Sequence, residues 1–358
     1  MMNSNPRSPT LITVNHSPEV QHFITEKCKD FVGRQFVFDA IHTFMNHYSR
    51  GYFILVGFPG MGKSSILSQY VFKNPQTFFY TCEINNYNQT EVFLETLFNQ
   101  LIQAYSLSYS NLPENATTDG WFLSAILQQV SDLLLPDEKL IIVIDGCDKT
   151  YVSLRERLNY STQPLGSNLF YLPRYLPDNV YILLSRRPFL SEQSGLLVET
   201  PCQLLDLSQY PEQNQQDIQA YLNQFDLNNK TIQEISNQSQ SNFKYAVERV
   251  KAIDQSSSEI PPGIIEYYQS HWQQITGGNL SELQLNIINC WTEQNEWLSA
   301  EMIAEELEED EYEIQLILED WIEFLECCEI NSEICYRWYH RSFCEFLRER
   351  CTTPGMRT

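Results

Sequence analysis

The hydrophobic residues in the first half of the chain occur as short continuous runs separated by helical patterns. The runs, which are rich in aromatic and β-branched residues, cover 52–56, 77–84, 140–144 and 179–185. Apolar residues recur at helical spacing from Gln35 onward and in 65–72, 91–105 and 121–135. Continuous apolar strands alternating with helices are typical of a parallel sheet that is covered on both faces. The pattern therefore predicts an α/β domain with helices on both faces of a parallel sheet.

After residue 207 the pattern changes to short helices within a Gln- and Asn-rich tract. Helical spacing at 218–225 and 243–253 predicts a small helical domain, and the adjacent prolines of 256–263 predict a turn-rich linker. The last part has helical patterns at 282–291, 298–306 and 312–325, then a strand-like stretch at 335–339 and a final helix. This order predicts an α-rich winged helix.

These changes of pattern divide the chain into five parts. They are an N-terminal extension (1–30), the α/β domain (31–207), a helical lid (208–272), a winged helix (280–350) and a tail (351–358).

Composition limits the classes of protein that the chain can belong to. Its 358 residues are 42% hydrophobic, which is enough for two or three domains with real cores. The net charge of -23 disfavours nonspecific attraction to nucleic acid or to an anionic membrane. No apolar run approaches the roughly 18 residues of a membrane span, and a signal-peptide pattern is not visible, so we expect a cytoplasmic protein. The ten cysteines contain no C-x-x-C pair and predict neither a zinc site nor a disulfide framework.

One motif carries chemistry. The stretch from Gly57 to Ser64 matches G-x-x-x-x-G-K-[ST] and lies between a predicted buried strand and a predicted helix. In such a phosphate loop the backbone N–H groups surround the phosphates, Lys63 adds a positive charge, and the Ser64 hydroxyl coordinates Mg²⁺. The other loop residues expected to bind nucleotide are Gly57, Pro59, Gly60, Met61, Gly62 and Ser65. The motif predicts binding of ATP or ADP with Mg²⁺.

Further candidates follow two other predicted strands. Asp145 ends the run Leu140–Ile144 and is the expected second ligand of Mg²⁺, while Asp148 is placed to orient or deprotonate an attacking water. Arg186 or Arg187 follows the run 179–185, and we assign the sensing of γ-phosphate charge to Arg186. A helix-capping role for the aspartates and a solvated loop position for the arginine remain the alternatives.

With these elements in order, the chain resembles the signal-transduction ATPases with numerous domains, the STAND class, and is most similar to NACHT-type members. The resemblance extends over nearly the whole chain. Its elements, besides the phosphate loop, are Phe31-Val32-Gly33-Arg34, Ile144-Asp145-Gly146-Cys147-Asp148, Leu184-Ser185-Arg186, the stretch 261–268 and the stretch 339–347.

The resemblance implies a nucleotide-gated switch. ADP holds the winged helix against the NTPase core in a closed monomer, and exchange for ATP releases it so that protomers assemble. Val32 and Arg34 then line the adenine pocket, Pro262 packs near the adenine, and His340 contacts the β-phosphate in the closed state. A plain linker proline and a histidine packed beside Trp338 and Tyr339 are the alternatives for the last two.

The chain also departs from the family pattern. Position 149 is Lys and position 35 is Gln where the family usually carries acids, and the first change weakens the case for fast hydrolysis. Neither an effector domain nor sensor repeats are visible, because about 30 residues precede Phe31 and about ten follow the last predicted helix. We therefore expect a switch ATPase with slow turnover, or alternatively a non-hydrolysing scaffold that nucleotide stabilises.

A DNA-binding AAA+ ATPase also combines a phosphate loop with a winged helix. Between residues 281 and 350, however, there are 19 acidic residues, four arginines and no lysine. A basic face for phosphate contacts is hard to build from this composition, so we expect no nucleic-acid partner. The acidic stretch 301–313 is either a solvated helix face or a docking surface for a basic protein partner.

Overall fold

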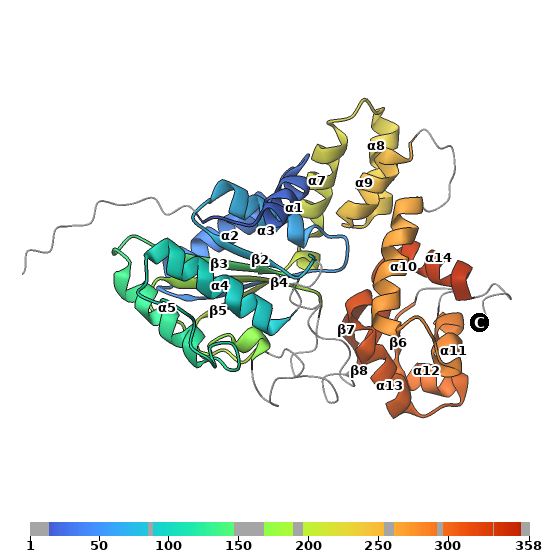
Figure 1. Ribbon diagram of the computed structural model, residues 1–358. Coiled ribbons are helices and arrows are strands. Elements are labelled where there is room, and N and C mark those ends of the chain that lie inside the picture. Colours follow the sequence, from blue (N-terminus) through green and yellow to red (C-terminus); the bar gives the residue numbers. More distant parts are fainter. Residues whose placement is uncertain are drawn as a thin grey trace, which may run out of the picture.

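The computed structural model describes residues 14–84, 89–146, 168–188, 196–253, 261–291, 296–331 and 333–351. Three units follow one another along the chain (Figure 1). The first contains a five-stranded sheet, the second is a group of helices, and the third contains a three-stranded sheet. Among the helices of these ranges, none is both long enough and apolar enough to cross a membrane.

All strands of the first sheet run parallel, in the order β2-β3-β4-β1-β5. Their bounds are β1 Gly51–Val56, β2 Phe78–Thr81, β3 Leu140–Asp145, β4 Val180–Arg186 and β5 Cys202–Asp206. Because parallel strands end at the same edge, the loop after β1 and the carboxylate at the end of β3 face each other across the end of β4.

Helices cover both faces of this sheet, as the hydrophobic pattern predicted (Figure 1). They are α1 Pro18–Cys28, α2 Gln35–His47 and α3 Lys63–Lys73 on one face, and α4 Thr90–Tyr105 and α5 Trp121–Leu133 on the other. Side chains of one strand alternate between the two cores, as the twofold strand period requires: Val143 of β3 belongs to the first core and Ile144 to the second.

Two elements of the first unit were not predicted. Helix α1 lies in the stretch assigned to the N-terminal extension, and only Val20 and Ile24 of its residues are buried, so its apolar pattern is weak. Its start does follow the usual rule, because the Ser17 side chain accepts a hydrogen bond from Val20 N–H. Strand β5 lies at the sheet edge with only Leu205 buried, so it lacks the continuous apolar run of the inner strands.

The lid consists of three helices with a small core of their own. They are α7 Pro211–Leu222, α8 Asn229–Ser239 and α9 Phe243–Lys251, preceded by the short helix η4 Leu207–Gln209. Asparagines of the polar tract begin two of them: the side chain of Asn228 accepts from Thr231 N–H and that of Asn242 from Tyr245 N–H. The Asn-rich composition thus serves as helix capping.

The third unit has the helix order and antiparallel hairpin of a winged helix. Its elements are α11 Glu282–Trp291, β6 Leu298–Ser299, α12 Ala300–Leu307, α13 Glu311–Asp320, η5 Ile322–Phe324, β7 Leu325–Ile330, β8 Glu333–Trp338 and α14 Arg341–Cys351. The sheet order is β6-β8-β7. The helical pattern predicted to continue to Leu325 ends earlier, because the chain turns there into the first strand of the wing.

Helix α10, Pro262–Thr276, connects the lid to the winged helix. It begins inside the stretch predicted as a linker, so that linker does not extend to Gly263. Its Trp272 ring lies 5.2 Å from the ring of Trp321 and 5.6 Å from that of Phe343. Aromatic packing of this kind fixes α10 to the winged helix rather than leaving it as a free connector.

Candidate functional site

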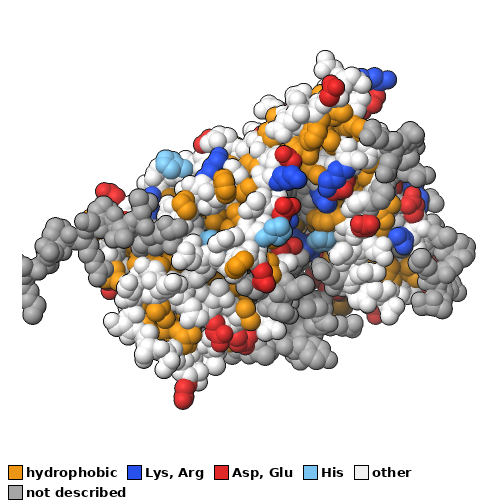
Figure 2. All heavy atoms as spheres, turned by 45° about the horizontal axis from the view of Figure 1, so that its top comes forward, with side chains coloured by type: hydrophobic (Ala, Val, Ile, Leu, Met, Phe, Trp, Pro, Cys, Tyr) orange, Lys and Arg blue, Asp and Glu red, His pale blue; other side chains and the backbone are white. Residues whose placement is uncertain are grey.

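A cavity of about 680 Å³ opens at the carboxyl edge of the parallel sheet. Its walls come from the end of α1 and the segment before α2, the phosphate loop and the start of α3, the ends of β2, β3 and β4, the lid, and α10. Its size lies within the range usual for small-molecule sites. Figure 2 shows Lys, Arg and His side chains near acidic ones in the middle of one face of the molecule.

The phosphate loop has the backbone shape that its glycines allow. Gly60 has φ +87° and Gly62 has φ +93°, a region that side-chain-bearing residues rarely adopt. Gly62 is also the residue directly before α3, so the positive end of that helix faces the cavity. A Cβ at Gly60 would lie 2.2 Å from Oδ1 of Asn242 in the lid. Only glycine therefore lets the lid approach the loop this closely.

The structure brings the lysine and serine of the motif to the positions that the motif implies. Lys63 Nζ donates hydrogen bonds to the carbonyl oxygens of Gly57 at 2.5 Å and Phe58 at 3.2 Å. Ser64 Oγ donates to Asp145 Oδ1 at 3.1 Å. The two predicted metal ligands are thus adjacent, although 81 positions separate them in the sequence.

Asp145 is fully buried and receives hydrogen bonds from three hydroxyl groups. Besides Ser64, these are Ser185 at 2.5 Å and Thr81 at 3.3 Å. Burial raises the pKa of the Asp145 carboxyl, as does the nearby charge of Glu83, while the bonds from Ser185 and Ser64 lower it. Removal from water is thus the largest influence on the pKa of this carboxyl group.

These oxygens fit a magnesium ion. Hard cations prefer hydroxyl and carboxylate oxygen, and Mg²⁺ in phosphate-binding sites takes one or two protein ligands and completes its shell with water and phosphate. Within the residues that the structure describes, there is no cluster of three or more His, Cys, Asp or Glu that could form an all-protein metal cage. Ser64 and Asp145 suffice for a metal that arrives with a nucleotide.

Arg34 connects the phosphate loop to the lid. It is 2% exposed, its guanidinium donates to the carbonyl oxygen of Met61 at 2.8 Å, and it also bonds to Asn214 Oδ1. Its backbone N–H donates to Asp217 Oδ2 at 2.9 Å, and its guanidinium lies 4.8 Å from the centre of the Phe243 ring. Burial lowers the pKa of Arg34 to about 10, so it stays positively charged at neutral pH.

The two residues predicted to line the adenine pocket, Val32 and Arg34, both line the same cavity. Val32 lines the cavity and packs on the lid core that also contacts Phe243 and Val247. Phe31 and Tyr221 line the cavity as well. An apolar and aromatic end next to a phosphate loop has the chemistry needed to hold a base.

Arg186, the last residue of β4, and Arg187, the next residue, have different surroundings. Arg186, the residue we assigned, is 4% exposed and does not appear in the cavity wall, while Arg187 lines it. Ser185, which contacts Asp145, lines the cavity together with Arg187. The Arg187 guanidinium also forms an ion pair with Glu323 of the winged helix. The sensing role of Arg186 remains a prediction.

Three further candidates are only partly described. Asp148 and Lys149 lie outside the described residues, as does the side chain of Pro262, which is the first residue of α10. The remaining predicted binding residues line the cavity or form its wall: Pro59, Gly60, Gly62 and Ser65 line it directly, Gly57 accepts from Lys63, and Met61 accepts from Arg34.

His340 lies in the contact between the winged helix and the lid. Its Nδ1 accepts the Ser342 backbone N–H at 3.1 Å, so Nε2 carries the proton and donates to the Ser239 carbonyl oxygen at 3.0 Å. The ring is 2% exposed and is not among the residues that line the cavity. Contact with a phosphate is thus not part of this arrangement, and that role remains a prediction.

The buried state of His340 makes the stability of the protein depend on pH. Burial lowers the pKa of His340 from 6.5 to about 4, so the unfolded chain binds a proton there that the folded chain does not between these values. The contribution of this neutral histidine to stability is complete above pH 6.5 and falls as the pH drops toward 4. Between pH 7.5 and 5 we expect the free energy of unfolding of wild type to fall by about 2 kcal/mol more than that of His340→Gln. Urea unfolding of both proteins at the two pH values measures this difference, and an equal fall in the two proteins would contradict it.

The winged helix also reaches the phosphate loop itself. The rings of Phe58 in the loop and Tyr339 in the winged helix stack with their centres 5.3 Å apart. Together with the pair of Arg187 and Glu323, this contact joins the third unit to two segments of the nucleotide site. The lid and the winged helix thus both hold the loop.

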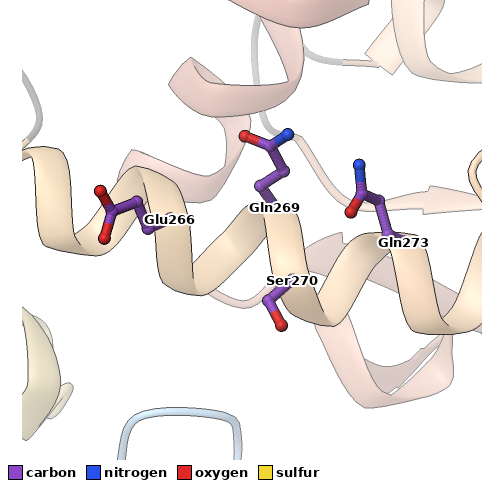
Figure 3. A pocket seen from close by; sticks show the side chains of 4 residues that line it. All are labelled: Glu266, Gln269, Ser270 and Gln273. Carbon is purple, nitrogen blue, oxygen red and sulfur yellow. The ribbon is translucent and has the colours of Figure 1, made fainter.

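A second hollow is shallow and lies on α10 (Figure 3). It is lined by Glu266, Gln269, Ser270 and Gln273, all from one helix, and Ser270 points away from the two glutamines (Figure 3). Gln269 accepts a hydrogen bond from Arg350 of α14 at 3.1 Å. No nucleophile with a base, and no metal-binding set, stands among these side chains, so the larger cavity is the candidate site.

Several residues of the larger cavity had not been singled out from the sequence. They are Glu83 after β2, Lys244 on α9 and Tyr267 on α10. Asn214 and Asp217 on α7, which bond to Arg34 beside the cavity, had not been singled out either. Glu83 carried no readable signal, because the strand predicted at 77–84 includes it, whereas the observed β2 ends at Thr81. The lid and α10 residues carried none, since only folding brings their helices to the loop.

Comparison with known proteins finds similar solved structures but no matching family. No protein-family model matches the chain, and no curated protein matches it. Among solved structures it is similar to RuvB of Thermotoga maritima, described as a Holliday junction branch migration motor, at 14% identity over 87% of this chain and 95% of that one, with a TM-score of 0.35. It is similar to Drosophila ORC bound to DNA at 13% identity over 92% and 98%, with a TM-score of 0.34.

A third similar structure is the ORC2 protein of Aeropyrum pernix, at 11% identity over 94% of this chain and 93% of that one, with a TM-score of 0.35. At such scores the overall arrangement of these proteins is not transferable to this chain. The class follows from the chain itself: the parallel sheet, the loop after β1 and the carboxylate at the end of β3 define a P-loop NTPase fold.

Proposed function

We propose that this protein is an adenine-nucleotide-binding ATPase that acts as a switch of the STAND type, similar to NACHT members. The observation that carries the proposal is that lid and winged helix both contact the phosphate loop. Arg34 joins the Met61 carbonyl to the lid, and Tyr339 of the winged helix stacks on Phe58. A change in the loop on nucleotide exchange therefore acts directly on the positions of both other units.

The charge around the cavity supports an anionic ligand. The chain has 23 basic and 46 acidic residues, yet the cavity is lined by seven basic and four acidic side chains. The basic ones are Lys27, Lys29, Arg34, Lys63, Arg187, Lys244 and Lys251. A local excess of positive charge in so acidic a protein favours a polyphosphate, which offsets the mutual repulsion of the basic side chains.

The residues have the following tasks in this proposal. The backbone N–H groups of the loop and Lys63 hold the phosphates. Ser64 and Asp145 hold Mg²⁺, which neutralises charge on the phosphates when it is bound. Val32 and the aromatic lid residues enclose the base, and an arginine at the end of β4 responds to the γ-phosphate.

The winged helix is not suited to DNA in this proposal. In such domains the recognition helix enters the major groove, and the corresponding α13 carries Glu311, Glu313, Glu319 and Asp320. Acidic side chains on that helix repel the phosphate backbone. We therefore assign the winged helix to contact with the NTPase core, and the acidic stretch 301–313 is left as a candidate surface for a basic protein partner.

The experiment that tests this function identifies the retained ligand. The protein is purified without added nucleotide and denatured, and chromatography of the released small molecules is expected to give stoichiometric ADP. Light scattering with ADP and with a slowly hydrolysed ATP analogue then compares the molecular mass, and a larger mass with the analogue is expected. A protein that is empty and also fails to bind ATP with Mg²⁺ would contradict the proposal.

A further inference from the structure

Glu83 occupies a position that neither the phosphate-loop motif nor the resemblance to STAND proteins assigns. Strand β2 ends at Thr81, three residues earlier than its apolar pattern predicts, and Thr81 pairs with Asp145 in the sheet register. Glu83 follows two residues later, at the same carboxyl edge. It lines the cavity together with Lys63 and Ser64. The end of β2 thus places a second carboxylate beside the metal-binding one.

A chain of hydrogen bonds fixes the backbone that carries this carboxylate. The Glu83 N–H donates to Thr81 Oγ1 at 3.2 Å, and that hydroxyl donates to Asp145 Oδ2 at 3.3 Å. The residue between them, Cys82, is buried and donates its N–H to the Asp145 carbonyl oxygen at 2.9 Å. The backbone of Glu83 is therefore tied to β3, whereas its side chain is exposed at the cavity.

The carboxylate also lies close to the other groups of the site. A Cβ built on Gly146 would be 3.4 Å from Glu83 Oε1, so the Glu83 carboxylate lies against the residue that follows Asp145. The same charge contributes to the raised pKa of Asp145. A carboxylate on a fixed strand end, in the same cavity as Ser64 and Asp145, is a candidate for a group that acts on water near bound phosphate.

We propose that Glu83 is a catalytic residue that binds the water attacking the γ-phosphate; this rests on the proposed ATPase function. The water oxygen forms a bond to the γ-phosphorus as the bond from that phosphorus to the bridging oxygen breaks. ADP leaves with the electron pair of the broken bond. The proton lost by the water passes to Glu83 and then to the phosphate product, so ATP and water give ADP and phosphate.

The proposal can be separated from the role predicted for Asp148, three residues beyond the metal aspartate. Three substitutions are compared with wild type: Glu83→Gln, Asp148→Asn, and Glu95→Gln as a control on the exposed side of α4. Gln keeps the size and hydrogen bonding of Glu but has neither its charge nor its proton affinity. Each protein is examined for ATP affinity with a fluorescent ATP analogue and for single-turnover conversion of bound ATP. Chromatography then identifies the nucleotide that each protein retains.

Glu83→Gln is expected to convert ATP at least about a hundredfold more slowly. Its affinity for ATP is expected to stay within roughly threefold of wild type, because an interaction made only in the transition state does not contribute to ground-state binding. The variant should retain ATP where wild type and Glu95→Gln retain ADP. Asp148→Asn is expected to slow the conversion of ATP less than Glu83→Gln does.

Three results would overturn the assignment of Glu83. They are normal turnover in Glu83→Gln, loss of ATP binding together with turnover in that variant, and a wild type that binds ATP without hydrolysing it. Failure of the proposed function looks different, because wild type itself would then bind no nucleotide.

Discussion

Lys63→Ala is expected to weaken binding of ATP and ADP at least about a hundredfold, since hydrogen bonds to charged groups contribute roughly 1.5 to 3 kcal/mol each. Lys63 Nζ lies at the loop, where it donates to the carbonyl oxygens of Gly57 and Phe58. Bound phosphate supplies a charged acceptor in the same place, and no neighbouring side chain of the loop replaces the lost charge. Titration with a fluorescent nucleotide measures the effect.

The matched control is Lys73→Ala. Lys73 is on the last turn of the same helix, exposed to solvent and close to the Phe38 ring, 5.3 Å from its centre. The Lys73→Ala substitution removes the same charge at the opposite end of α3, so the affinity for ATP and ADP should be unchanged. Equal affinity of Lys63→Ala and wild type would mean that the loop does not bind phosphate.

Arg34→Ala is expected to destabilise the folded protein by about 3 kcal/mol or more, because removing one partner of a buried charged network leaves the others uncompensated. The substitution leaves the buried Asn214 Oδ1 without its guanidinium donor, removes the ion pair with Asp217 at 3.9 Å and cuts the link from the lid to the Met61 carbonyl. Nucleotide affinity should fall as well, since the lid is no longer fixed to the loop. Urea unfolding without nucleotide gives the first effect and nucleotide titration the second.

Arg50→Ala provides the comparison for Arg34. Arg50 pairs with Asp178 at 3.2 Å, but both side chains are exposed, at 39% and 64%. Surface pairs of this kind contribute no more than about 1 kcal/mol. A loss of stability in Arg34→Ala no larger than that in Arg50→Ala would show that the buried network does not hold the lid.

The local part of the nucleotide site was predictable from the sequence, because a phosphate loop needs consecutive residues. Glycines at 60 and 62, the lysine and the serine must lie within one turn between a strand and a helix, and spacing alone identifies them. Asp145 was also predictable, since a carboxylate after a buried strand reaches the carboxyl edge of any parallel sheet. The α/β fold with helices on both faces followed from the same apolar runs.

The sequence pattern failed to predict β5 and α1 and misplaced the start of α10. β5 has a single buried residue, because an edge strand packs on one side only, and α1 buries only Val20 and Ile24. The extent of α10 was misjudged, because adjacent prolines can precede a helix as well as end one, and Pro262 occupies its first position. For β5 and α1 the deciding contacts come from residues distant in the chain.

The sequence by itself determined the phosphate loop, the carboxylate at the end of β3, the parallel sheet and the acidic winged helix. These depend on short-range order, in which residue spacing already dictates geometry. Only the tertiary structure decided that Arg34 joins loop and lid, that Arg187 pairs with Glu323, and that His340 is buried against the lid. It also placed Glu83 at the metal-binding edge. These contacts between units join residues a hundred or more positions apart. They form only when the units pack together, so the local sequence pattern does not predict them.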